Sequence, residues 1–160
     1  MANKTILEIK NLDISFRTNA GTIHAIRGVN LDLQKGETVA IVGESGSGKS
    51  VTMKAACGLL DANATINSGE VLYNYTDENG TEVSVDLLKL PKKQLRKDYN
   101  GNRIAMVFQD PMTSLDPTMQ IGRQIMEGMI LHQGMSKADA WKRSVELLGL
   151  GMEAYNKRRQ

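Results

Sequence analysis

The residues whose types and spacing point most directly to chemistry form one run at positions 43–50. In order, the run consists of Gly43, Glu44, Ser45, Gly46, Ser47, Gly48, Lys49 and Ser50. This is a full match to the phosphate-loop pattern G-x-x-x-x-G-K-[ST]. The glycines allow successive backbone N–H groups to turn toward a phosphate, Lys49 can reach the β and γ phosphates, and the Ser50 hydroxyl can bind Mg²⁺. The run therefore predicts a site for the phosphates of a nucleoside triphosphate, with ATP as the expected ligand.

A Gly/Ser-rich linker that happens to precede Lys-Ser is the alternative interpretation of this run. The flanking sequence argues against it. Residues 38–42 form a short, β-branched apolar run that predicts a buried strand, and residues from Lys49 to about position 60 are compatible with a helix. A helix that begins at the loop adds its partial positive charge to the anion site. The order of strand, loop and helix favours phosphate binding.

The remaining elements follow from hydrophobic periodicity and turn residues. Alternation predicts strands at 5–16 and 23–33, with a tight turn at 34–37, and Ser68-Gly69 opens a further strand at 70–75. Residues 103–108 predict another short buried strand, and the basic stretch 89–97 predicts a solvated helix or loop. Two helices are expected at 119–132 and 136–148, the second with a capping box between Ser136 and Asp139.

Composition and charge restrict the classes of function. A length of 160 residues fits one domain, and a net charge of +2 gives no indication of a general nucleic-acid-binding surface. No apolar run approaches the ~18 residues of a membrane span, and the polar N-terminus lacks the order of a signal peptide. The chain is therefore expected in the cytosol.

Several other side chains that could take part in chemistry are interpreted as structural. Cys57 lies among apolar residues and is expected in the core. His24 and His132 have no second ligand at metal spacing and are expected to be surface or packing residues. Met119, Met126 and Met129 have helical spacing and are expected to face the core.

The residues around the loop resemble the ATP-binding subunits of ABC transporters, most closely those of oligopeptide and dipeptide importers. The resemblance rests on residues 28–43, which look like the family's lead into its phosphate loop, and on the loop sequence itself. Residues 104–111 look like the family's strand and Q-loop, and residues 112–117 resemble the peptide-importer subgroup specifically. Phe16 stands about where the family has an aromatic residue that stacks on adenine.

This resemblance implies roles, cofactors and partners. Gln109 would bind Mg²⁺ and position the attacking water, Ser50 would also bind Mg²⁺, and Phe16 would bind the adenine of ATP. The partners would be the transmembrane permease subunits of an importer and a second ATP-binding subunit, with no nucleic acid. The subunit would lie at the cytoplasmic face of the cell membrane as a peripheral protein without a transmembrane segment of its own.

The resemblance also implies a fold and a domain organisation. The fold is an α/β phosphate-loop NTPase of the ABC type, with an N-terminal antiparallel β portion, a partial parallel core sheet and part of a helical subdomain. Residues 1–160 would form a truncated nucleotide-binding domain. Residues 1–111 would hold the β portion and the partial core, and residues 112–160 would belong to the helical subdomain.

Three motifs that the resemblance leads one to expect are absent from the sequence. There is no Leu-Ser-Gly-Gly-Gln-like signature, no apolar strand ending in Asp-Glu after Gln109, and no switch histidine. Because phosphoryl transfer depends on positioned charges around the γ phosphate, the chain is expected to bind ATP weakly at best and to hydrolyse it negligibly. The full-length subunit would be an ATPase.

Three alternatives stay open at the level of sequence. A non-transport ABC-type ATPase, acting in DNA repair or translation, would share the loop but not the importer-like stretch at 112–117. A phosphate-loop GTPase or small-molecule kinase would need a guanine-reading Asn-Lys-x-Asp or an acceptor pocket, whereas Asn156-Lys157 is followed by Arg158 and Arg159. A non-enzymatic binding module is the third alternative.

Overall fold

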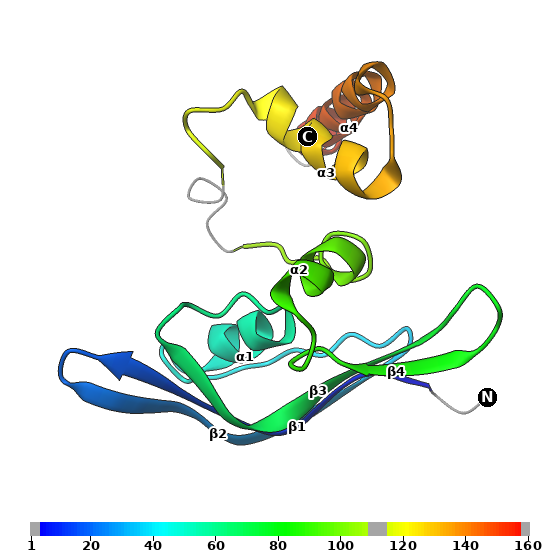
Figure 1. Cartoon of the computed structure of the whole chain (residues 1–160). Helices are drawn as coiled ribbons and strands as arrows, with labels where there is room; N and C mark the ends of the chain where they lie inside the picture. The colour runs from blue at the N-terminus through cyan, green and yellow to red at the C-terminus, as the bar shows by residue number, and fades with distance from the viewer. Residues whose placement is uncertain (1–3, 109–114, 158–160) are drawn as a thin grey trace. The chain divides into compact units, whose positions relative to one another are not determined.

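The structure is a computed structural model that describes residues 4–108 and 115–157, and the side chains of its last helix only as far as Gly149. The chain divides into two compact units, Met1–Arg96 and Lys97–Gln160 (Figure 1). Each unit has its own packing.

The first unit is built on an antiparallel sheet that has four strands among the described residues. The strands are β1 (Thr5–Thr18), β2 (Gly21–Gln34), β3 (Ala64–Thr76) and β4 (Glu82–Asp86), in the order β2-β1-β3-β4 (Figure 1). The strands predicted at 5–16, 23–33 and 70–75 are confirmed, although β3 begins earlier, at Ala64. Strand β4 was not predicted, because five residues between two turns give a weak alternation signal.

A β-bulge in β1 explains how its apolar residues all reach the core. Ile9, Leu12 and Ile14 are completely buried, although strict alternation would place position 12 on the face opposite position 9. The register of β1 shifts after Ile9 against β2 and after Lys10 against β3, as expected for an inserted residue. The inserted residue is Asn11, with a φ of 47°. The bulge thus turns Leu12 and Ile14 to the same side as Ile9.

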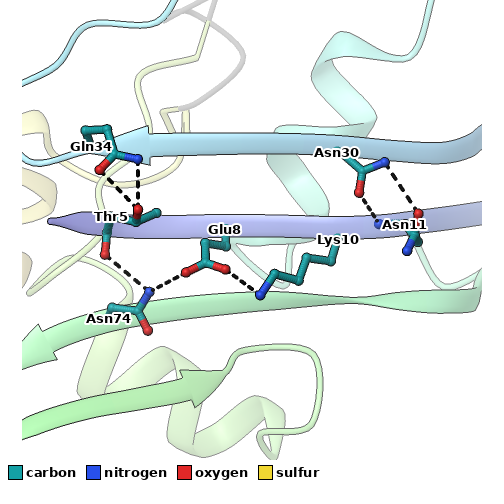
Figure 2. Close-up of polar contacts among 7 residues, drawn as sticks. All are labelled: Thr5, Glu8, Lys10, Asn11, Asn30, Gln34 and Asn74. Atoms are coloured by element: carbon teal, nitrogen blue, oxygen red, sulfur yellow. Dashed lines mark hydrogen bonds and ion pairs between the residues drawn. The ribbon is translucent and has the colours of Figure 1, made fainter. Parts of the chain in front are cut away.

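Two features hold this bulge in place. The Asn11 backbone N–H donates to Oδ1 of Asn30 on β2 at 2.9 Å, as Figure 2 shows. On the other side, Gly69 of β3 has a φ of 106°, and a Cβ there would lie 2.6 Å from Cα of Leu12. Only glycine allows the two backbones to approach this closely.

Polar side chains link three of the strands outside the core. Nδ2 of Asn74 on β3 donates to the Thr5 carbonyl and to Glu8, both at 3.2 Å, while Thr5 also exchanges hydrogen bonds with Gln34 on β2 (Figure 2). Lys10 forms an ion pair with Glu8 and, as the largest cause, holds the pKa of that carboxyl below its usual value. These contacts fix the register from β2 across to β3.

A single helix follows the predicted phosphate loop on one side of the sheet. It is α1 (Lys49–Ala56), and Thr52, Ala55 and Ala56 are its buried residues (Figure 1). Cys57, just after it, is also buried, and burial raises the pKa of its thiol. The core position expected for Cys57 is confirmed. The basic stretch contains α2 (Lys92–Gln94) and the π-helical turn η1 (Leu95–Tyr99), which confirms the expectation of a solvated helix because Lys92 and Lys93 are exposed.

The buried strands predicted at 38–42 and 103–108 are not formed, so that prediction is wrong. Residues 38–42 and 105–108 have no assigned secondary structure, and Ile104 takes part only in an isolated bridge with Asn100. Val42 and Val107 are 91% and 97% exposed. A strand exists only where a neighbouring segment accepts its backbone hydrogen bonds, and no described segment does so here. The partial parallel sheet is therefore absent from the described residues.

The second unit contains the helices α3 (Ile121–Gln133) and α4 (Lys137–Lys157). The two predicted helices and the capping box are confirmed, because the Asp139 backbone N–H donates to Oγ of Ser136 at 3.2 Å. The predicted end near Leu148 is wrong, since α4 continues to Lys157. A glycine inside a helix costs about 1 kcal/mol, so Gly149 and Gly151 weaken the helix without ending it.

The histidines and methionines lie largely as expected. Nε2 of His24 on β2 lies 2.6 Å from Oδ1 of Asp13 on the exposed part of the sheet, and His132 packs against Gly101 in the second unit. Met129 is buried, while Met119 and Met126 are half-buried. The described residues contain no cluster of three or more His, Cys, Asp or Glu side chains that could hold a metal ion.

Candidate nucleotide-binding site

The conformation of the loop at 43–50 depends on glycine at two positions. Gly46 and Gly48 have φ values of 80° and 92°, in the left-handed region that L side chains rarely adopt. At Gly48 space is limiting as well, because a Cβ would lie 2.5 Å from Cδ1 of Ile26 and 3.3 Å from the Ala25 carbonyl oxygen. Strand β2 therefore supports the loop from one side, and Gly48 lets the backbone lie against it.

The start of α1 is left without a side-chain cap. Gly48 is the N-cap residue and, having no side chain, cannot accept a hydrogen bond from the first turn. The first backbone N–H groups of a helix have no partner within the helix, and they carry the positive end of its dipole. An anion at this position would satisfy them.

Lys49 closes the loop from within. Its Nζ donates to the carbonyl oxygens of Gly43 at 2.8 Å and Glu44 at 2.7 Å, and to Oγ of Ser47 at 3.3 Å. The ammonium group is therefore held against the loop backbone and not extended into solvent. These three acceptors are uncharged, so an anionic phosphate oxygen would attract the Lys49 ammonium more strongly, through direct Coulomb attraction.

Thr52 anchors the loop to the helix, and sequence reasoning missed it. Its backbone N–H and its hydroxyl both donate to the Gly48 carbonyl, at 2.9 and 3.1 Å, and its side chain is buried. A hydroxyl four residues after the N-cap glycine is the signal that could have identified it, since serine and threonine in helices often bond the carbonyl four positions earlier. Thr52 therefore holds the Gly48 carbonyl at the start of α1.

The surroundings of Ser50 fit Mg²⁺ held mainly by water and phosphate. Ser50 is the second residue of α1 and is exposed, so its hydroxyl is open to solvent. Because the described residues offer no carboxylate cluster, an ion here would take most of its ligands from elsewhere. Mg²⁺ commonly keeps several waters and binds through substrate phosphates, which agrees with a single protein hydroxyl.

Of the other two predicted site residues, only Phe16 lies among the described residues. Phe16 is half-buried in β1, where it pairs with Ile23 of β2 and Ala64 of β3. It is not part of the hydrogen-bonded loop. Gln109 lies outside the described residues. The structure thus brings together residues 43–50 and leaves the adenine and water-positioning roles as predictions.

Comparison with known sequences decides the family. The sequence profile of the ABC transporter family matches residues 26–160, which include the whole loop. The chain belongs to the ABC transporter family. Among the described residues, no helix is long and apolar enough to cross a membrane.

Several ABC transporter relatives share close to half of their aligned residues with the chain. The dipeptide transport ATP-binding protein DppD of Lactococcus lactis is 53% identical over 92% of this chain, and the oligopeptide transport ATP-binding protein OppD of Bacillus subtilis is 49% identical over 91%. OppD of Escherichia coli is 45% identical over 89%. The chain spans about two fifths of the length of these relatives, at 40%, 38% and 39%.

Solved structures show the same ABC fold. Two dimeric structures of the cassette MJ0796 superpose with TM-scores of 0.65 and 0.68 at 29% and 28% identity, covering 90% of this chain and 56% of that one. One of them is described as a post-hydrolysis state bound to ADP and Pi. The α/β fold of the ABC-type phosphate-loop NTPases is confirmed, with the parallel strands missing from the described residues.

Proposed function

We propose that this chain is the nucleotide-binding part of an ATP-binding subunit that couples ATP binding and hydrolysis to the import of peptides or a related small solute. The observation that carries the proposal is the loop at 43–50, with Lys49 held against its backbone and the start of α1 uncapped. The 53% and 49% identity to dipeptide and oligopeptide transport proteins supports the transport role.

Each candidate residue has a distinct proposed role. The backbone N–H groups of the loop and of the first turn of α1 bind the phosphates, and Lys49 leaves its carbonyl acceptors to bind the β and γ phosphates. Ser50 binds Mg²⁺, which neutralises phosphate charge when it is present. Gln109 contributes to the metal site and orients the attacking water, and Phe16 stacks on adenine.

The proposed domain comprises residues 1–160. Residues 1–111 form its β portion and core, and residues 112–160 lie within a helical subdomain.

The proposed partners are the transmembrane permease subunits of an importer and a second ATP-binding subunit. Relatives named as transport ATP-binding proteins and the dimeric MJ0796 structures support both. The proposed location is the cytoplasmic face of the membrane, as a peripheral subunit. Recovery of permease subunits with the tagged subunit would support transport over a role in DNA repair or translation, and recovery of the ATPase without any membrane protein would count against it.

Nucleotide binding is tested by thermal shift of the 160-residue chain with Mg-ATP and Mg-GTP. At a concentration one hundred times Kd, a ligand that binds only the folded state adds about 2.7 kcal/mol, which raises Tm by several degrees. We expect this shift with Mg-ATP, a smaller one with Mg-GTP, and none with Lys49→Ala. Lys54→Ala, at the other end of α1, is the matched control and should keep the shift. Equal shifts in wild type and Lys49→Ala would reject the loop as the site.

We further propose that the 160-residue chain binds ATP with negligible turnover, because no residue of its sequence is assigned as a catalytic base. Phosphate release measured at high protein concentration tests this. Turnover equal to that of a complete subunit, and abolished by Lys49→Ala, would contradict the proposal.

A further inference from the structure

The peptide group at the start of α1 is held by the side chain of Thr52 as well as by the helix itself. The Gly48 carbonyl accepts two hydrogen bonds from Thr52, one from its backbone N–H at 2.9 Å and one from its hydroxyl at 3.1 Å. The first bond belongs to the regular pattern of a helix, whereas the second depends on the residue type at position 52. Thr52 is only 5% exposed, so water competes little for its hydroxyl.

The orientation of the Gly48 carbonyl decides where the Lys49 backbone N–H points. Both groups belong to one planar peptide unit whose bond is trans, so they point in opposite directions. The carbonyl points along α1 toward Thr52, and the Lys49 N–H therefore points out of the start of the helix. As the first residue of α1, Lys49 has no acceptor for this N–H within the helix. It is one of the backbone donors that a phosphate would bind.

Position 48 needs support from its neighbours because it is a glycine. Gly48 has a φ of 92° and no side chain to restrict its backbone, and glycine has more conformational freedom to lose than any other residue. Ile26 of β2 limits it from one side, since a Cβ at position 48 would lie 2.5 Å from Cδ1 of Ile26. Thr52 holds its carbonyl from the helix side. A loop that is ordered in advance loses less entropy when it binds a ligand.

We propose that Thr52 is a positioning residue for phosphate binding, which acts through the Gly48 carbonyl on the direction of the Lys49 backbone N–H. The inference rests on the proposed function of the loop at 43–50, and it adds to that function a residue outside the phosphate-loop pattern. Loss of the Thr52 hydroxyl leaves the backbone hydrogen bond to Gly48 in place. The loop therefore keeps its fold and holds the Lys49 N–H less rigidly.

Isothermal titration calorimetry of the 160-residue chain with Mg-ATP tests this role. Thr52→Val keeps the shape of the side chain and removes its hydroxyl. We expect the Kd for Mg-ATP to rise about three- to ten-fold, the scale of one hydrogen bond. Thr52→Ser restores the hydroxyl and should bind Mg-ATP like wild type. Magnesium pyrophosphate has no base or sugar, and its Kd should rise in Thr52→Val by the same factor as that of Mg-ATP.

Lys54→Gly separates positioning of the loop from stability of the helix. Lys54 lies in the last turn of α1, and glycine inside a helix weakens it. Urea denaturation of each variant measures the stability. Lys54→Gly should lower stability at least as much as Thr52→Val does, and it should leave the Kd for Mg-ATP unchanged.

Several results would overturn the inference. Equal Kd values for wild type and Thr52→Val would do so, as would a loss of affinity in Thr52→Ser or Lys54→Gly as large as that in Thr52→Val. A loss for Mg-ATP without one for magnesium pyrophosphate would assign the effect to a region outside the phosphate site and would also overturn it. In each of these cases wild type still binds Mg-ATP, so the proposed function stands. No binding of either ligand by wild type would instead reject the loop at 43–50 as the site, and this inference with it.

Discussion

Strand β1 and the segment at 38–42 were both predicted to be strands, and only β1 forms one. Both are rich in β-branched and aliphatic residues, yet Ile9, Leu12 and Ile14 of β1 are completely buried, whereas Val42 is 91% exposed. Strand β1 has a hydrogen-bonded neighbour on each side, and no described segment pairs with residues 38–42. Local pattern thus reports the tendency to form a strand, and a partner strand decides whether it forms.

The largest expected effect comes from the bulge that orients the core residues of β1. Gly69→Ala places a Cβ 2.6 Å from Cα of Leu12 and 2.8 Å from two backbone carbonyl oxygens, at a φ of 106°. Because backbone atoms cannot move aside cheaply, we expect a loss of about 4 kcal/mol or more in the free energy of unfolding, measured by urea denaturation. Gly80→Ala is the control, since its Cβ would meet nothing within 4 Å, and it should cost about 1 kcal/mol. Similar losses for both would show that the bulge does not depend on close approach.

Truncating one side chain in β1 and one in residues 38–42 tests the contrast in burial between the two segments. Ile14→Ala removes buried methyl groups and leaves a cavity, so we expect a loss of about 3 kcal/mol. Val42→Ala removes groups that are already in water, and the expected change is below about 0.5 kcal/mol. A loss above about 1.5 kcal/mol for Val42→Ala would show that residues 38–42 are packed in solution, and the contrast with β1 would fail.

The smallest expected effect concerns a polar contact on the sheet. Asn67 donates to Oδ1 of Asp13 at 2.6 Å and, with His24, holds the pKa of that carboxyl below its usual value. A lowered folded-state pKa gives stability that is present above the unfolded-state pKa near 3.8 and is lost as the pH falls through the folded-state pKa. Asn67→Ala should raise the pKa of Asp13 and reduce this acid-side loss of stability.

Carboxyl-detected NMR titration measures the pKa of Asp13 directly. Asn74→Ala is the control, because Asn74 lies on the same strand and bonds Thr5 and Glu8 instead. An unchanged pKa of Asp13 in Asn67→Ala would mean that the contact is not maintained in solution.

The sequence predicted the phosphate loop and the strands β1 and β2 well, because each depends on local residue types. The G-x-x-x-x-G-K-[ST] pattern identifies residues 43–50 without knowledge of the fold. The bulge was also present in the sequence, as a spacing of three between Ile9 and Leu12 where alternation requires two. The spacing does not predict the role of Gly69, because the contact of Gly69 with Leu12 joins two different strands.

Other features depend on contacts that no local pattern contains. The hydrogen bonds from Lys49 to the carbonyls of Gly43 and Glu44 follow from the path of the loop, and the support of Gly48 by Ile26 joins residues 22 positions apart. The strands expected at 38–42 and 103–108 failed for the same reason, since pairing is decided outside the segment. The glycines at 149 and 151 predict too early an end for α4, because a cost of about 1 kcal/mol for each is too small to end the helix.

Hydrogen–deuterium exchange of the 160-residue chain with and without Mg-ATP tests the central claim most directly, because it reports on the backbone N–H groups that are proposed to bind phosphate. We predict slower exchange at residues 44–51 on addition of Mg-ATP in the wild type and in Lys54→Ala, and no change in Lys49→Ala. Protection that appears elsewhere and leaves 44–51 unchanged, or that persists in Lys49→Ala, would contradict the assignment of this loop as the ATP site.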